Sequence, residues 1–159
     1  MSTLQSAVAL IGRALLASIF LVSALPKLFH YADAAAYLAT FGVPPQALPV
    51  IIAIELGCGL AILVGVLTRP AALLLAVLAV ATAVTFHRNI GVDVELVNFM
   101  KNIAIAGGLL QLVAYGPGRW AVMPGHVEDA DAAPEFAAPA PMPQPGVAQF
   151  PPVAAARRR

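Results

Sequence analysis

Four long apolar segments dominate this chain, and each is long enough to cross a membrane as a helix. They cover residues 4–25, 48–67, 70–87 and 96–115. A hydrocarbon core about 30 Å thick requires roughly 20 helical residues at about 1.5 Å per residue. Composition agrees, because 60% of the residues are hydrophobic and only 11% are charged, which is unlike a soluble domain. We therefore predict an all-α fold in which four transmembrane helices form an antiparallel bundle.

Proline and glycine residues indicate where the predicted helices end. Proline disfavours a helical conformation in the preceding residue, so we expect the first helix to end near Pro26. A short interfacial helix is expected over residues 33–41, and Thr68-Arg69-Pro70 forms a tight turn between antiparallel neighbours. Gly116-Pro117-Gly118 ends the fourth helix. These boundaries define a transmembrane domain over residues 4–120.

The remaining residues, 121–159, differ in composition from the helices. An acidic stretch gives way to an Ala/Pro-rich segment that ends in three arginines. Such a segment buries too little apolar area to offset its ordering entropy, so we predict a disordered tail. The overall net charge of +1 gives no basis for a nucleic-acid partner.

The distribution of charge between the two ends of the bundle predicts its orientation. Arg69, Arg119 and the terminal arginines share one end, whereas the other end carries several acidic residues beside its cations. The positive-inside rule then places both termini in the cytoplasm.

Charged residues inside the apolar segments are the candidate functional site, because charges in a bilayer usually face the bundle interior and pair. Counting from the expected helix ends places Arg13 and Glu55 within about 6 Å of each other in depth. The same count places His87 about 4 Å and Lys101 about 7 Å below the outer face. We therefore predict an Arg13–Glu55 pair within a polar cluster in the outer half of the bundle. The cluster comprises Arg13, Lys27, Glu55, His87, Lys101 and Asn102.

Small residues at helical spacing indicate which helix faces pack together, because they allow close approach in lipid. In the third segment a stripe that ends on His87 consists of Ala72, Ala76, Ala79 and Ala83. In the fourth segment Lys101, Ala104 and Gly108 share a face. We expect both stripes to face the interior.

Each polar residue also has a purely structural interpretation. Arg13 and Glu55 would then only fix the helix register. Lys101 would extend to the outer interface, and His87 would be an interfacial residue. Cys58 is the lone cysteine, which excludes dithiol chemistry within one chain and favours a packing role. One histidine with one carboxylate provides too few ligands for a metal site.

Several short motifs occur in a fixed order between residues 7 and 120, about three-quarters of the chain. They are Gly12-Arg13-Ala14-Leu15-Leu16 with Phe20 and Lys27; Glu55-Leu56-Gly57-Cys58-Gly59 followed by Gly65-Val66-Leu67-Thr68-Arg69; and His87, Lys101-Asn102 and Gly116-Pro117-Gly118. Together these motifs resemble the DoxX family of small bacterial integral membrane proteins.

The resemblance implies a four-helix membrane protein related to a subunit of a thiosulfate:quinone oxidoreductase. Some family members are linked to thiol and oxidative-stress defence. Our leading hypothesis is an accessory or quinone-interacting component of a membrane redox system. Its cationic pocket would hold a quinone head group or a small oxoanion, with Arg13 and Lys101 as donors and Glu55 orienting the ligand or accepting a proton. No cofactor is evident from the sequence, and a quinone is a possible ligand. The expected partners are the lipid bilayer and either redox proteins or a second copy.

Two alternatives stay open at this stage. One is a non-enzymatic scaffold or anchoring subunit, in which the charges only specify packing. The other is a small-solute carrier that acts as an oligomer, since a single four-helix chain shows no inverted repeat.

Overall fold

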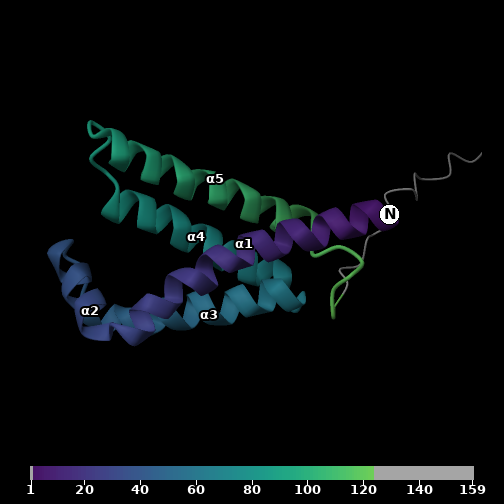
Figure 1. The fold of residues 1–159 in the computed structure, drawn as a ribbon, viewed down its shortest axis with the longest axis horizontal. Helices are drawn as coiled ribbons and strands as arrows, with labels where there is room; N and C mark the ends of the chain where they lie inside the picture. Colours follow the sequence, from purple (N-terminus) through teal and green to yellow (C-terminus); the bar gives the residue numbers. More distant parts are fainter. Residues whose placement is uncertain (1, 124–159) are drawn as a thin grey trace, which may run out of the picture. The chain divides into compact units, whose positions relative to one another are not determined.

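The computed structural model describes residues 2–123, and the predicted tail falls outside them from residue 124 onward. Within the described residues the fold is all-α, as predicted (Figure 1). The elements are α1 (Thr3–Phe29), α2 (Tyr31–Thr40), the 3-10 turn η1 (Pro45–Ala47), α3 (Leu48–Val64), α4 (Thr68–Phe86) and α5 (Asp93–Tyr115). In the part of the chain that the structure describes, four spans are long and apolar enough to cross a membrane: Thr3–Phe29, Pro45–Val64, Thr68–Phe86 and Asp93–Tyr115.

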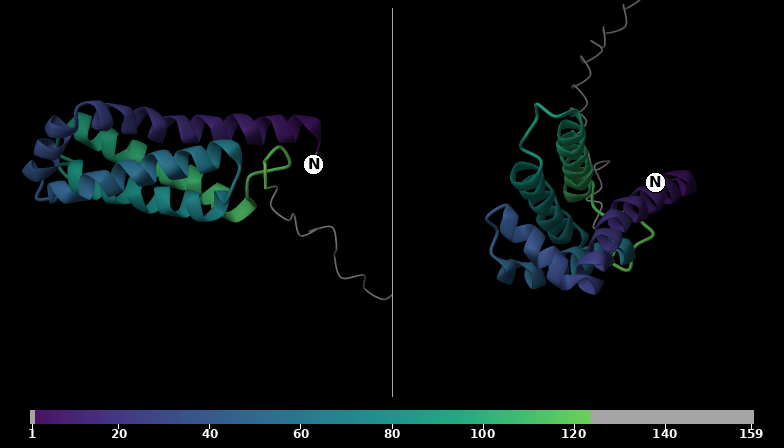
Figure 2. Two further views of the ribbon diagram at one scale, coloured as in Figure 1. Left: turned by 90° about the horizontal axis from the view of Figure 1, so that it is seen from below. Right: turned by 60° about the vertical axis from the view of Figure 1, so that its left-hand side comes forward.

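The four long helices pack as two pairs. α1 packs along α3, α4 packs along α5, and α3 joins the pairs by packing on α4. α1 and α5 touch only over a short stretch. The pairs lie close together near the α3–α4 turn and diverge toward the end that carries α2 (Figures 1 and 2).

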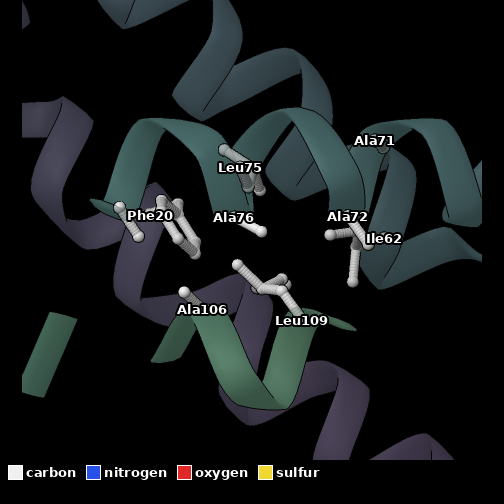
Figure 3. Packing of buried hydrophobic residues seen from close by; sticks show 10 residues of the cluster. Phe20, Ile62, Ala71, Ala72, Leu75, Ala76, Ala106 and Leu109 are labelled. Carbon is white, nitrogen blue, oxygen red and sulfur yellow. The ribbon is translucent and has the colours of Figure 1, made fainter. Parts of the chain in front are cut away.

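The main apolar core lies where the two pairs meet (Figure 3). The predicted small-residue stripe of α4 is confirmed, because Ala72, Ala76, Ala79 and Ala83 are all buried. Larger side chains fill the space around the stripe: Phe20 from α1, Ile62 from α3, Leu75 from α4 and Leu109 from α5. The small alanine side chains thus let neighbouring helices approach α4 closely.

The predicted interior face of α5 is wrong at Lys101 and Ala104, although its third residue, Gly108, does pack against Leu16 of α1. Lys101 and Ala104 are exposed, whereas Ala106 and Leu109 are buried. The physical reason is that a lysine on the packed face would lie among apolar side chains without an acidic partner, which is costly. A small rotation of the helix buries the neighbouring face instead and leaves Lys101 outside.

Two predicted helix ends also need correction. α1 continues through Pro26 to Phe29, and the Pro26 carbonyl accepts a hydrogen bond from the His30 N–H at 2.8 Å. A proline costs the helix its own N–H bond but can still accept one from the next turn. α3 ends at Val64, three residues before the predicted end, because Gly65 adopts φ +84° and caps it.

Candidate functional site

A cavity of about 330 Å³ lies between the diverging helix pairs, near α2. Apolar side chains form most of its wall. The polar residues that line it are Ser23 and Lys27 from α1, Tyr37 from α2, Glu55 from α3, Thr82 and Thr85 from α4, His87 just after α4, and Asn102 from α5. Four of the six predicted cluster residues therefore line one cavity: Lys27, Glu55, His87 and Asn102.

An ion pair between Lys27 and Glu55 forms one side of this cavity. The Lys27 ammonium lies 2.7 Å from Oε1 and 2.8 Å from Oε2 of Glu55. Ser23 hydrogen-bonds to both groups, accepting from Lys27 at 2.8 Å and donating to Glu55 at 3.3 Å. Only 8% of the Glu55 side chain is exposed, against 24% for Lys27. The carboxylate is thus held deep in the wall with three hydrogen-bond contacts.

The continuation of α1 past Pro26 makes this pair form. Lys27 follows Ser23 by one helical turn, so both side chains lie on the same face of α1. If α1 ended at Pro26, Lys27 would leave the helix before it came level with Glu55. The sequence-based estimate assumed that end and did not place Lys27 opposite Glu55.

The predicted Arg13–Glu55 pair is wrong. Arg13 donates from Nη1 to the Pro117 carbonyl at 2.9 Å and from Nη2 to the Trp120 carbonyl at 2.8 Å. The register of α1 on α3 explains the difference, because Gly59 lies against Leu21 and Ala17. In antiparallel helices this contact puts Glu55 level with Ser23 and leaves Arg13 about 15 Å further along.

Arg13 instead organises the opposite end of the bundle. Its side chain is 2% exposed and lies beside Gly65, where an added Cβ would meet Arg13 Nη1 at 2.8 Å. The chain after α5 folds back over this region, and the Met123 N–H donates to the Gly65 carbonyl at 3.0 Å. The Gly116-Pro117-Gly118 motif marked the turn in the sequence, but nothing local indicated that Arg13 would bind it.

The connection between α4 and α5 is closed by His87 and Glu95, whose Nδ1 and Oε2 atoms lie 2.7 Å apart. His87 lines the cavity, and Glu95 lies in the first turn of α5. Asn102 donates its amide to the Asn98 carbonyl at 3.0 Å. Lys101 is exposed and does not line the cavity. The structural interpretation of Lys101 in the sequence analysis, in which its side chain extends to the outer interface, also kept it out of the polar cluster.

An aromatic cluster next to the cavity was not foreseen from the sequence. Tyr37 stacks on Phe86 at 5.7 Å between ring centroids, and Phe41 meets both rings, at 5.1 Å from Tyr37 and 5.0 Å from Phe86. The cluster fastens α2 to the end of α4. The signal in the sequence was the pair of aromatic residues in the interfacial helix, four residues apart and so on one face.

Comparison with known proteins identifies the family. The DoxX family model matches residues 8–88. The chain is 39% identical to the inner membrane protein YqjF of Escherichia coli (strain K12), over 77% of this chain and 94% of that protein. It is 34% identical to the inner membrane protein YphA of the same organism, over 69% of this chain and 83% of that protein. No solved structure matches at a significant level.

The chain therefore belongs to the DoxX family. With its four long apolar helices, it is a multi-pass membrane protein.

Proposed function

We propose that this protein is an inner-membrane component of a redox system and that it holds a quinone head group in the cavity between its helix pairs. The observation that carries the proposal is the combination of a mostly apolar cavity with a partly buried, hydrogen-bonded Lys27–Glu55 pair in its wall. The names of the two Escherichia coli relatives support the inner membrane as its location.

The size and lining of the cavity suit a small, mostly apolar ring. Its volume of about 330 Å³ lies within the range of about 300–1,000 Å³ that is usual for small-molecule sites. Phe20, Leu78 and Phe86 offer apolar contact, while Thr82 and Asn102 bring a hydroxyl and an amide to the same space. A quinone needs this combination, because its ring is apolar and its carbonyl oxygens accept hydrogen bonds.

The charges around the cavity favour a neutral ligand over an oxoanion. Lys27 is already paired with Glu55, and His87 is paired with Glu95. The other two predicted cations, Arg13 and Lys101, do not line the cavity. An oxoanion would lack an available cation and would lie close to the Glu55 carboxylate, so a neutral head group is the better fit.

We also propose that both termini lie in the cytoplasm. Arg69 and Arg119 are at the end of the bundle where α5 finishes, and the three terminal arginines follow α5 in the sequence, against Lys27 and Arg88 at the other end. The positive-inside rule then sets the first end in the cytoplasm. The cavity lies in the periplasmic half of the membrane in this orientation.

Purification in mild detergent, followed by mass spectrometry of the bound lipids and quinones, tests the proposal. We expect quinone to co-purify with the wild-type protein and to fall at least tenfold in the double variant Lys27→Met/Glu55→Gln, which removes the polar wall but leaves no unpaired charge. Lys101→Met is the matched control, because it removes a cation outside the cavity and should retain the quinone.

A different result would favour the scaffold alternative. A buried ion pair that only fixes helix register can be replaced by neutral groups without loss of stability. If the double variant is as stable as the wild type and neither protein carries or binds quinone, the ligand-site proposal is wrong.

A further inference from the structure

The cavity is closed on three sides by packed helices. Between α1 and α3 lies the Ser23–Lys27–Glu55 hydrogen-bond network. Between α3 and α4 lies a second apolar cluster, in which Phe86 packs against Leu38 and Ile52. α4 and α5 pack along their length, and His87 and Glu95 join their ends. The fourth side, between α1 and α5, lacks a comparable closure within the described residues.

α1 and α5 meet at Leu16 and Gly108. The absence of a side chain at Gly108 allows this contact, since an added Cβ would lie 3.2 Å from a methyl group of Leu16. Beyond it, toward α2, the helices diverge (Figure 1). The residues that follow Leu16 on the same face of α1 are Ile19 and Ser23, and those that precede Gly108 on α5 include Ile105 and Asn102.

These following residues line the cavity and also face outward. Ile19 is 48% exposed although it lines the cavity, and Ser23 is likewise exposed. Both conditions are met at the rim of an opening. Tyr37 on α2 and Ala81 on α4 meet them as well, so it is the short contact between α1 and α5 that places the opening between these two helices. Ile105 and Asn102 are half-buried and line the cavity from α5. The opening thus has Ile19 and Ile105 on its apolar rim. Ser23 and Asn102 lie about one helical turn nearer the end that carries α2.

We infer that the space between α1 and α5 is a lateral opening to the bilayer, through which a membrane-dissolved ligand with an apolar tail reaches the cavity. The inference rests on the proposed ligand site and specifies the class of ligand. The head group lies against the polar wall at Lys27 and Glu55, and the tail extends past Ile19 and Ile105 into lipid. Apolar rim residues can face the hydrocarbon of the bilayer without an energetic penalty, and they can contact the apolar tail of a ligand. A water-soluble ligand would make few favourable contacts with them.

Substitution at the rim tests this access route. Ile19→Trp should fold, since the side chain is half exposed, and it should obstruct the opening. Val22→Trp is the matched control, because Val22 is one turn away on α1, is 64% exposed and does not line the cavity. Ile19→Ala widens the opening without adding bulk. Each protein is reconstituted in lipid nanodiscs, and binding is measured for a decyl-substituted benzoquinone and for the same ring without its tail.

We expect the wild-type protein to bind the tailed quinone at least tenfold more tightly than the tail-less ring. Ile19→Trp should slow association of the tailed quinone at least tenfold, Val22→Trp should leave it unchanged, and Ile19→Ala should leave it equal or faster. Equal binding of the two compounds by the wild type, or equal rates in the two tryptophan variants, would overturn the lateral route while the ligand site stands. If neither compound binds to the wild-type protein, the proposed function fails, and the lateral route with it.

Discussion

At the residue scale, Lys27, Glu55 and Arg13 each bind partners that lie level with them along the helix axes. Lys27 and Glu55 lie level with each other and pair in the cavity wall. Arg13 lies toward the other end of the same helix pair, near backbone carbonyls that would otherwise be left without donors in an apolar setting. Its planar guanidinium binds two carbonyls at once, which the single ammonium of a lysine does not match.

The first prediction concerns Lys27 and Glu55. Lys27→Met alone leaves a buried carboxylate unpaired, and Glu55→Gln alone leaves an ammonium unpaired, so each should lower thermal stability in detergent. The double variant should lose less than the sum of the two, with a coupling of about 0.5–3 kcal/mol. Strictly additive losses would show that the two groups do not interact in the folded protein.

The second prediction concerns Arg13. Arg13→Lys keeps the positive charge but replaces two separate nitrogens, one on the Pro117 carbonyl and one on the Trp120 carbonyl, with a single nitrogen on a shorter side chain. We expect it to lower the free energy of unfolding by at least about 1.5 kcal/mol, the lower value for one hydrogen bond from a charged donor. Arg88→Lys is the control, because Arg88 is exposed at the other end of the bundle. Equal thermal stability of the two variants would contradict the assigned role of Arg13.

At the scale of the helices, one glycine decides how α3 ends and what covers that end. Gly65 has φ +84° and caps α3. A Cβ there would lie 2.5 Å from the Ala121 Cβ. The same residue thus stops the helix and leaves room for the chain that returns after α5. α1 behaves in the opposite way, since it passes through Pro26 and carries Lys27 to the cavity.

The third prediction compares two glycines of this region. Gly65→Ala should destabilise the protein by more than about 1 kcal/mol, because a left-handed conformation is unfavourable for alanine and the added methyl group collides with Ala121. Gly57→Ala, within α3, should be neutral or stabilising by up to about 1 kcal/mol, since nothing lies within 4 Å of its Cβ position. Thermal unfolding in detergent measures both. Similar losses in the two variants would argue against the described packing around Gly65.

At the scale of the whole molecule, the two ends of the bundle differ in construction. The end with the α3–α4 turn is sealed by Arg13, Gly65 and the returning chain, whereas the α2 end holds the cavity. Figure 2 shows α2 at one end of the long helices and the N-terminus at the other. The direction in which the bundle crosses the membrane therefore decides which compartment the cavity faces.

The fourth prediction fixes that direction. In a Cys58→Ala background, which removes the lone cysteine, single cysteines replace Asp33 or Met123, both exposed and at opposite ends of the bundle. A membrane-impermeant maleimide should label position 33 in intact cells, and position 123 only after the membrane is permeabilised. Labelling of position 123 in intact cells would reverse the proposed orientation and place the cavity on the cytoplasmic side.

The sequence by itself determined the number and approximate limits of the spanning helices, because segment length and hydropathy are local properties that the bilayer thickness constrains. It also identified the buried stripe of α4, since small residues at helical spacing specify a face without reference to a partner. The stop at Gly116 is local as well, whereas α3 was expected to run three residues past its actual end at Val64, which Gly65 caps. The family followed from short motifs in their order.

Only the tertiary structure decided which charges meet. Pairing depends on the register of one helix on another, and a shift of about ten residues separates Arg13 from Glu55 by about 15 Å. That register is set by the contact of Gly59 with Leu21, which involves residues far apart in the sequence. The face of α5 that is buried and the opening between α1 and α5 likewise depend on how the helix pairs diverge, which no single segment encodes.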